Sequence, residues 1–335
     1  MTYRIRPAER RDLAALNILA TAQASMRKAL DPRLPASPQV VPFLSAAHSL
    51  GDVLAWRHHA TFVAEQDGML VGGVNIYKVE QRESDQFATY YPRRFTSIGL
   101  LATHEHAPAG TLADLIASAQ AQANRWRTPF LLTQNASADR TMHDSLQALR
   151  FRTYYHYALK TPSPDSKGMT GAGVEGLIVR PALTGDLDAV VRLGMESVRY
   201  HSSLEPTMQV ARDEPSKMHE RLEQAIRDGE QSSVLVGERD GHVIGFYSIY
   251  VQQIDDTWTP PLFASGRYGL IAEVAVHPSL RGLGIGRQMF AAAKQWFSVR
   301  AVEGIWLIYL PHNPLSSRFW SALDFAPVWE VVLRD

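Results

Sequence analysis

The alternation of apolar and polar residues along this 335-residue chain predicts a succession of short strands and helices. Residues 270–276 are apolar except for Glu273, a pattern typical of a mostly buried strand. Pro278 ends this strand, because proline lacks an N–H group and has a fixed φ. After a glycine-rich segment, positions that suit one helix face recur at helical spacing: Gly286, Met289, Phe290, Ala293 and Phe297. Residues 304–310 then predict the next strand.

The sequence repeats itself at an offset of 174 residues, or 173 in one segment. Five pairs of segments share this register: residues 6–8 with 180–182, 12–13 with 186–187, 30–32 with 204–206, 65–72 with 238–245, and 148–151 with 322–325. The register predicts two copies of one domain, residues 1–160 and 177–335. The segment between them, residues 161–176, is rich in proline, glycine and serine, which indicates a linker. In each copy, Asp-Gly at 67–68 or 240–241 predicts a hairpin turn.

The segment Arg281-Gly-Leu-Gly-Ile-Gly286 has the character of a phosphate-binding loop. Glycines allow a positive φ and a close approach of the backbone to a ligand. Several N–H groups then converge at the positive end of a helix, which favours an anion. A dinucleotide loop is a poor fit, because its third glycine would fall on Arg287, and a Walker loop lacks its Gly-Lys-Ser/Thr ending. A glycine-rich turn without a ligand remains an alternative.

The corresponding positions of the first copy are Ala107, Pro108, Gly110 and Leu112. Only one of the three glycines is kept, the proline removes an N–H donor, and Glu105 nearby would repel a phosphate. We therefore expect the first copy, residues 1–160, to be a degenerate and non-catalytic version of the domain. His104 and His106 in the same loop are metal ligands or, on the simpler interpretation, solvated side chains, since no further ligand set is visible.

Composition narrows the function. Hydrophobic residues make up 45% and charged residues 20% of the chain, as in an ordinary globular protein. The formal net charge is zero, with 34 basic and 34 acidic residues, which argues against nucleic acid or an anionic membrane as the main partner. The chain has no cysteine, which excludes disulfides, thiolate metal sites and an acyl-cysteine intermediate. Its first residues are too charged for a secretory signal, so a cytoplasmic location is the default expectation.

The motif Arg281-x-x-Gly284-x-Gly286, preceded by the strand that contains Glu273, resembles the acetyl-CoA signature of the GNAT superfamily of N-acetyltransferases. Residues 313–325 resemble the family's second motif, with Asn313 and Pro314 expected as N-cap and first residue of a helix. Two positions depart from the family pattern: Asp324 replaces a glycine, and Trp320 replaces a tyrosine that is thought to protonate the departing thiolate in many members. An indole N–H is no practical acid, so packing and contact with the thiol both stay open for Trp320.

The resemblance implies an α/β fold of the α+β type, with two tandem GNAT-like domains, each a mixed, mostly antiparallel twisted sheet flanked by helices. It also implies direct transfer of an acetyl group from acetyl-CoA to an amine, without an acyl-enzyme intermediate, and no metal is expected. The residues implied for cofactor binding are Val274, Ala275, Val276, Arg281, Gly282, Leu283, Gly284, Ile285, Gly286, Arg287, Asn313 and Trp320. Residues 201–206 fall where the family's acceptor loop usually lies.

A protonated amine must lose a proton before it attacks. Glu273 is the candidate base, directly or through water, and its alternative role is a structural carboxylate paired at the strand edge. Tyr309 is the second catalytic candidate, and His277 and His201 are weaker ones. The proton for the leaving thiolate comes from Tyr309, from water, or from neither.

Two other functions compete with N-acetyl transfer. The missing tyrosine and the degenerate first copy are also compatible with a non-catalytic acyl-CoA-binding or sensor protein. Transfer to a thiol or hydroxyl, or of a longer acyl group, is a third possibility. The expected partner is a small-molecule or peptide amine acceptor, with no nucleic acid and no membrane. The chain is expected to be a monomeric pseudo-dimer or a homodimer.

Overall fold

The computed structural model describes residues 2–37, 58–86, 88–162, 173–255 and 262–335. Within these residues, twelve strands form one sheet in the order β1-β2-β3-β4-β5-β12-β6-β11-β10-β9-β8-β7. The first six strands along the chain are β1 (Arg4–Pro7), β2 (His59–Gln66), β3 (Met69–Glu80), β4 (Arg94–Thr103), β5 (Leu131–Ala136) and β6 (Arg152–Lys160). The other six are β7 (Ile178–Pro181), β8 (Ser232–Arg239), β9 (His242–Ile254), β10 (Gly266–Val276), β11 (Gly304–Tyr309) and β12 (Ala326–Arg334).

The helices follow the same repeat. The first copy contains η1 (Arg10–Asp12), α1 (Leu13–Leu30), α3 (Thr111–Trp126) and α4 (Arg140–Ala148). The second contains η2 (Thr184–Asp186), α5 (Leu187–Leu204), α6 (Glu214–Asp228), η3 (Pro278–Leu280), α7 (Ile285–Ser298) and α8 (Pro314–Ser321). An offset of 172 to 174 residues carries each strand of the first copy onto one of the second, and α1, α3 and α4 onto α5, α7 and α8. The predicted repeat and the mixed, mostly antiparallel sheet flanked by helices are confirmed.

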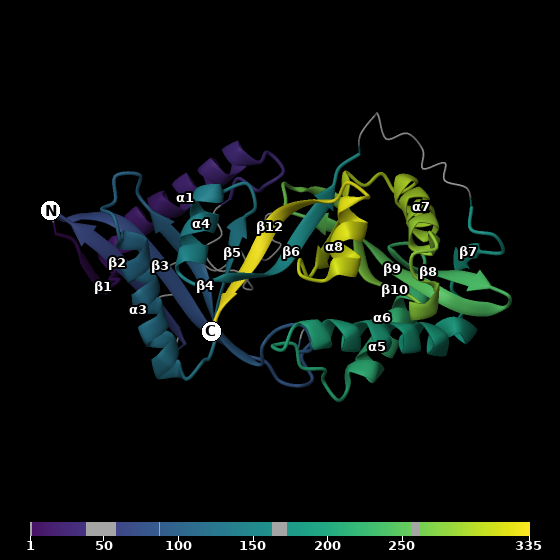
Figure 1. The fold of residues 1–335 in the computed structure, drawn as a ribbon. Helices are drawn as coiled ribbons and strands as arrows, with labels where there is room; N and C mark the ends of the chain where they lie inside the picture. Colours follow the sequence, from purple (N-terminus) through teal and green to yellow (C-terminus); the bar gives the residue numbers. More distant parts are fainter. Residues whose placement is uncertain (1, 38–57, 87, 163–172, 256–261) are drawn as a thin grey trace.

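The two copies exchange their last strands. β6 ends the first copy but pairs with β11 of the second, and β12 ends the second copy but pairs with β5 of the first. The exchanged strands β6 and β12 also pair with each other, antiparallel, and so join the two halves into one continuous sheet. Figure 1 shows β12, in yellow, running beside β6 through the middle of the molecule. Most of the predicted linker, residues 163–172, lies outside the described residues.

The hairpin turns are local and follow the sequence. Asp67 and Gly68 have φ values of 50° and 78°, and Asp240 and Gly241 have 52° and 74°. Two consecutive positive φ values are the geometry of a type I′ turn, whose twist matches that of the flanking strands. Both predicted hairpins, β2–β3 and β8–β9, are confirmed.

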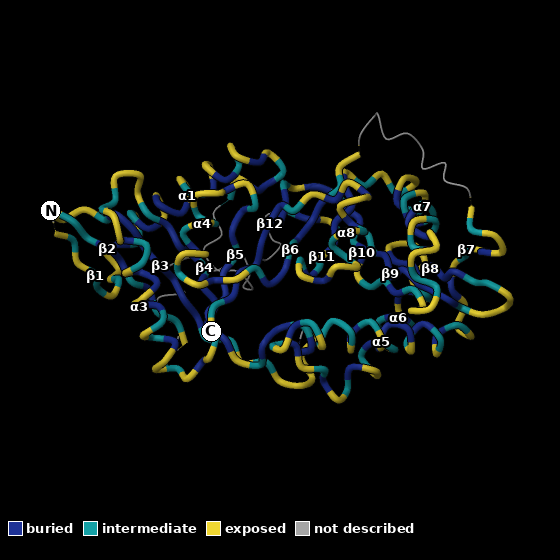
Figure 2. Tube along the Cα trace, viewed as in Figure 1, coloured by how far each residue is buried: buried dark blue, intermediate teal, exposed yellow. Residues whose placement is uncertain are grey.

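Helices cover both faces of the sheet, and the cores follow the central strands (Figure 2). On one face, α3 and α4 pack over the first copy and α7 and α8 over the second. On the other face, α1 covers the first copy, and α5 and α6 cover the second. Between the halves an aromatic cluster joins residues from both copies, including Tyr91, Tyr155, Phe263, Trp306 and Trp329. The halves therefore share a hydrophobic core as well as a sheet.

Polar contacts also tie the halves together at the loop between α5 and α6. Arg152 of β6 makes a bidentate ion pair with Glu205, at 2.7 and 2.9 Å, and Glu205 is only 1% exposed. The segment between β3 and β4 docks on α6, where the Thr89 hydroxyl donates to Glu214 at 2.6 Å. Lys217 donates to the Glu83 carbonyl at 2.6 Å. The first copy thus holds the start of α6 in place.

Arg152→Ala is expected to lower the free energy of unfolding by about 1–3 kcal/mol, because it leaves Glu205 buried without its main partner. The lower end allows for the partial exposure of Arg152. Burial would raise the pKa of Glu205, but the hydrogen bonds from Arg152 and Thr207 outweigh it, and the pKa is lowered. The stabilisation is therefore present at neutral pH and is lost as pH falls below about 4. Urea unfolding of the wild type and the variant, at neutral pH and below about pH 4, measures this stabilisation.

The control is Arg4→Ala, which removes an ion pair with Glu65 in which Arg4 is largely exposed. Its expected effect is below about 1 kcal/mol. Equal losses for the two variants, or a loss for Arg152→Ala that does not shrink in acid, would contradict the role given to this inter-copy pair.

Candidate active site

The site is built where β10 and β11 stop pairing. The two strands pair in parallel from Tyr268 and Gly304 to Ile271 and Leu307, although β10 continues to Val276 and β11 to Tyr309. A register shift against β9 between Ile271 and Glu273 marks a bulge at this point. We call residues 272–276 of β10 and 308–309 of β11 the fork. It leaves backbone groups of β10 without a neighbouring strand on one side, where an extended ligand can bind to them.

The predicted phosphate loop lies between β10 and α7. Gly282 and Gly284 have φ values of 81° and 86°, a region that side chains disfavour. Gly284 is the N-cap of α7, and an added Cβ at Gly282 would meet nothing within 4 Å. In the described part of the chain, no backbone acceptor is recorded for the N–H groups of Gly282, Leu283, Gly284 or Ile285. These donors lie at the positive end of a helix, as an anion site requires, and Gly282, Leu283 and Gly284 are exposed.

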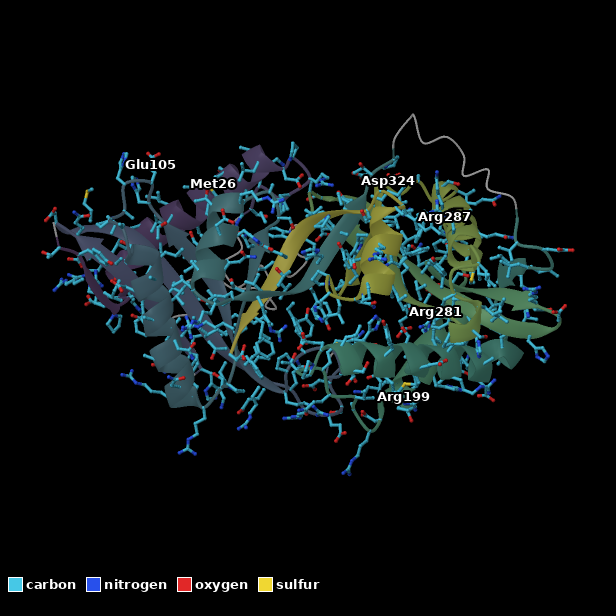
Figure 3. All side chains as sticks on the ribbon, in the orientation of Figure 1. Met26, Glu105, Arg199, Arg281, Arg287 and Asp324 are labelled. Carbon is cyan, nitrogen blue, oxygen red and sulfur yellow. The ribbon has the colours of Figure 1, made fainter. Side chains whose placement is uncertain are left out.

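The two arginines of the loop differ in orientation. The Nε of Arg281 donates to the Val276 carbonyl at 3.1 Å, and its guanidinium lies over the Tyr200 ring at 5.6 Å. Arg281 therefore fastens the loop to the end of β10. Arg287 is exposed on the first turn of α7, close to the loop (Figure 3). Among the described residues, the Arg287 side chain has no hydrogen bond or ion pair, and it is available to a phosphate.

The start of α7 is fixed from below. The Tyr247 hydroxyl donates to the Gly286 carbonyl at 2.9 Å. A Cβ on Gly286 would lie 3.3 Å from the Phe319 ring, so the third glycine allows the close approach of α8. The side chain of Gln288 accepts from the Val174 N–H at 2.8 Å. These contacts hold the start of α7, and with it the end of the loop, in a fixed position.

The equivalent loop of the first copy has the same backbone turn but different chemistry. Gly110 is the N-cap of α3 with a φ of 91°. The first helical N–H, that of Thr111, already donates to the Pro108 carbonyl at 3.1 Å. Asp114 places a carboxylate in the first turn, where the Tyr3 hydroxyl donates to it. The counterpart of Val274 in the first copy is Leu101 of β4. Its carbonyl already accepts a hydrogen bond from the side chain of Gln23 on α1.

Glu273 lies on β10 at the fork, in a partly buried charged network. Its Oε1 accepts from Arg221 of α6 at 2.8 Å, and Arg221 also contacts Glu214 at 3.0 Å. Burial raises the pKa of Glu273, although the charge and hydrogen bond of Arg221 oppose the rise. Tyr90, from the first copy, interacts electrostatically with the same carboxylate. The ion pair with Arg221 agrees with a structural role for Glu273. The raised pKa of Glu273 agrees with a role as the base.

Tyr309 ends β11 on the other arm of the fork. Its hydroxyl lies 3.1 Å from Nδ1 of His156, which stands opposite it on the exchanged strand β6. Tyr309 packs against the side-chain cluster beneath α7 and α8, whereas Glu273 faces α6. The two catalytic candidates therefore flank the fork from opposite faces of the sheet.

Asn313 and Trp320 are both on α8. Asn313 caps the helix, and its Oδ1 accepts from the N–H groups of Leu315 at 3.0 Å and Ser316 at 3.4 Å, as predicted. Trp320 is 6% exposed and contacts four aromatic rings, those of Tyr247, Phe290, Phe319 and Phe325. Its recorded contacts are those of a packing residue.

The four histidines singled out from the sequence are His104, His106, His201 and His277, and they have no recorded contact with Glu273 or Tyr309 within the described residues. The prediction that residues 201–206 form a loop is wrong for residues 201–204, because α5 continues to Leu204 and only Glu205 and Pro206 lie beyond it. Burial, together with Arg281 and His312, lowers the pKa of His201 to about 4. His277 is exposed and bonds to Ser279. His104 and His106 are also in a loop, and no group of three or more potential metal ligands occurs among the described residues.

Sequence reasoning missed Arg221, Glu214 and His156. The two residues of α6 belong to a helix with an ordinary amphipathic pattern, in which buried charges resemble surface charges. His156 reaches the fork only because of the strand exchange. The residues next to Arg221, Glu214 and His156 in the sequence carry no pattern that indicates a role at the fork.

Comparisons with known proteins agree with this geometry. Residues 198–325 match the acetyltransferase (GNAT) family. A mycothiol acetyltransferase from Frankia alni is 29% identical over 90 residues, which span 27% of this chain and 27% of that protein. A GCN5-related N-acetyltransferase from Sphaerobacter thermophilus has the same fold, with a TM-score of 0.55 and 14% identity over 99% of this chain and 95% of that one.

A tandem GNAT protein from the clavulanic acid biosynthesis pathway is also similar, with a TM-score of 0.47 and 14% identity over 99% of this chain and 98% of its own. No helix within the described ranges is long and apolar enough to cross a membrane. The family match covers the loop, the fork and α8, and this part of the second half is similar to the GNAT acetyltransferase family.

Proposed function

We propose that the chain transfers an acetyl group from acetyl-CoA to an amine, at one site in its second half. The observation that carries this proposal is the loop of residues 282–285, whose free N–H groups lie at the helix end next to the fork. The first copy has the same turn, but its first helical N–H is bonded and a carboxylate lies beside it. A diphosphate therefore fits the second half and not the first.

The residues of the fork would divide the binding between them. The N–H groups from Gly282 to Gly286, with Arg287, would hold the diphosphate. The backbone of Val274, Ala275 and Val276 would bind the extended pantetheine arm in place of a strand. Bound acetyl-CoA supplies the acetyl group as a thioester. Asn313 supports this arrangement by holding the start of α8.

Glu273 would take the proton from the amine. Its Oε1 is held by Arg221, and no hydrogen bond to its Oε2 is recorded among the described residues. The raised pKa strengthens the carboxylate as a base. Tyr309, on the other arm of the fork, would give a proton to the thiolate that leaves. The pair matches the two proton transfers that acetylation of an amine requires.

The acceptor approaches from the side of α6, where Glu273 lies. Because one similar protein is a mycothiol acetyltransferase, small-molecule amines come first in a screen, ahead of peptides. The loop between α5 and α6, held by Arg152 and Thr89 of the first copy, would shape this side of the site.

Calorimetric titration of acetyl-CoA into the purified chain is expected to give one site per chain. Release of the CoA thiol in the presence of a panel of amines then tests turnover. Two sites would contradict the loss of the first site. Binding without turnover on any amine would favour the acyl-CoA-binding protein, and absence of binding would refute both functions.

A further inference from the structure

The first half of the chain reaches the reacting end of the fork through its exchanged strand. β6 places His156 directly opposite Tyr309, with Nδ1 3.1 Å from the tyrosine hydroxyl. The two rings meet edge to face, with centroids 5.4 Å apart and an interplanar angle of 82°. Both side chains are partly buried. The contact exists only because the last strand of one copy lies beside the other copy.

The second sequence motif lacks a phenol, and Tyr309 lies on the same face of the sheet as the position where it is missing. Trp320 occupies the position at which many family members have a tyrosine, and its buried indole offers no acid. Tyr309 packs against the same side-chain cluster as Trp320, on the sheet face that α8 covers. A phenol is thus present on the right face, although it comes from β11 instead of α8.

His156 belongs to a polar row that crosses the centre of the sheet. The next residue in the row is Glu330 of β12, which pairs in register with His156 and is 3% exposed. His143 of α4 contacts both Glu330 oxygens at 2.8 Å, and Asn135 donates to one of them at 2.9 Å. Burial lowers the pKa of His156, with His143 acting in the same direction and Glu330 against it. A neutral imidazole carries one N–H, and in the tautomer with the proton on Nδ1 this N–H meets the Tyr309 hydroxyl oxygen.

We propose that His156, supplied by the first half, positions Tyr309 as the proton donor to the leaving thiolate. This inference rests on the proposed function. His156 donates its Nδ1–H to the phenol oxygen, so that the phenol proton points into the fork. On transfer, the O–H bond of Tyr309 breaks and an S–H bond forms. The negative charge passes to the phenol oxygen, where the Nδ1–H stabilises it until water returns a proton. His156 is a positioning residue, and it gives the degenerate copy a task in the reaction.

The kinetic test is a double-variant cycle. His156→Leu is expected to lower kcat roughly tenfold, the scale of one hydrogen bond to a charged group, with the KM for acetyl-CoA unchanged. His156→Asn, which keeps an N–H near the Nδ1 position, should recover most of this loss. In a Tyr309→Phe background, His156→Leu should have no further effect. His106→Ala, on an exposed loop of the same half, is the control and should be neutral.

Equal losses from His156→Leu in the wild-type and Tyr309→Phe backgrounds would overturn the inference, as would a His156→Asn variant that is no better than His156→Leu. The unfolding curve of each variant is first measured and compared with that of the wild type. A variant that unfolds is replaced by His156→Gln, whose amide N–H also keeps a donor but lies further out, and which should recover less than His156→Asn.

A second readout does not depend on turnover. Histidine labelled with ¹³C in the ring gives one NMR signal for each of the 12 histidines, and His156→Asn assigns that of His156. Addition of CoA is expected to shift the His156 signal in the wild type and not in Gly284→Glu. If CoA binds and shifts other signals but not this one, the inference fails while the proposed function stands. If CoA does not bind at all, the proposed function fails, and the inference with it.

Discussion

Gly284→Glu is expected to weaken acetyl-CoA binding roughly a hundredfold or more, equivalent to about 2.7 kcal/mol. The residue has a φ of 86°, caps α7, and lies among the free N–H groups proposed to hold the diphosphate. A carboxylate at this point would take those donors and repel the phosphates. Calorimetry of acetyl-CoA binding measures the change, with a circular dichroism melt to confirm that the chain is folded.

The repeat offers a matched control for this variant. Gly110 has a φ of 91°, caps α3, and is the counterpart of Gly284. An added Cβ would meet its nearest neighbour at 3.4 Å at Gly110 and at 3.6 Å at Gly284, so the two substitutions carry similar strain. Gly110→Glu should therefore lower stability by a similar amount and leave binding unchanged. Loss of binding in Gly110→Glu, or its survival in Gly284→Glu, would put the cofactor elsewhere.

Glu273→Gln is expected to lower kcat about 10²- to 10³-fold with little change in acetyl-CoA binding. The amide keeps the shape of the side chain but cannot accept the amine proton. Because burial raises the pKa of Glu273, the wild-type rate should rise with pH through that pKa and level off above it, where the carboxylate is ionised. This acidic limb should disappear in the variant. Rate measurements across pH, at saturating acetyl-CoA, test both statements.

The control for Glu273→Gln is Glu238→Gln. Glu238 also pairs with an arginine in the second half, Arg180, but lies on β8 away from the fork. Its kcat and pH profile should match the wild type. If Glu273→Gln destabilises the chain yet retains kcat, Glu273 is the structural partner of Arg221 and another group is the base.

Features that depend on neighbouring residues could be predicted from the sequence. The Asp-Gly turns, the Asn313 cap and the loop glycines each follow from backbone preferences of a few adjacent residues. The repeat was visible for the same reason, because it preserves those residues at a fixed offset. The end of α5 was harder, since His201-Ser-Ser has no helix-breaking residue and proline comes only at 206.

The strand exchange could not be predicted, because β6 and β12 occupy equivalent places in the repeat. Both strands are mostly buried along their length, so the local sequence pattern does not say which copy each of them completes. The aromatic core shared by the two halves favours the observed pairing. The His156–Tyr309 contact and the Arg221–Glu273 pair depend on such distant choices, which is why the catalytic candidates were identified without their partners.

The exchange of β6 and β12 between the two copies also has a consequence for the evolution of the gene. After a duplication, a redundant copy is normally free to decay and be deleted. Here, deletion of the first copy would remove β6 from beside β11 and leave β12 without β5. Changes to the first copy's loop before α3, where proline and acidic residues stand, leave both pairings intact, whereas loss of its last strand would uncover β11. The evolutionary cost of a change in the first copy is therefore expected to depend on whether it reaches β5 or β6, the two strands on which the second half relies.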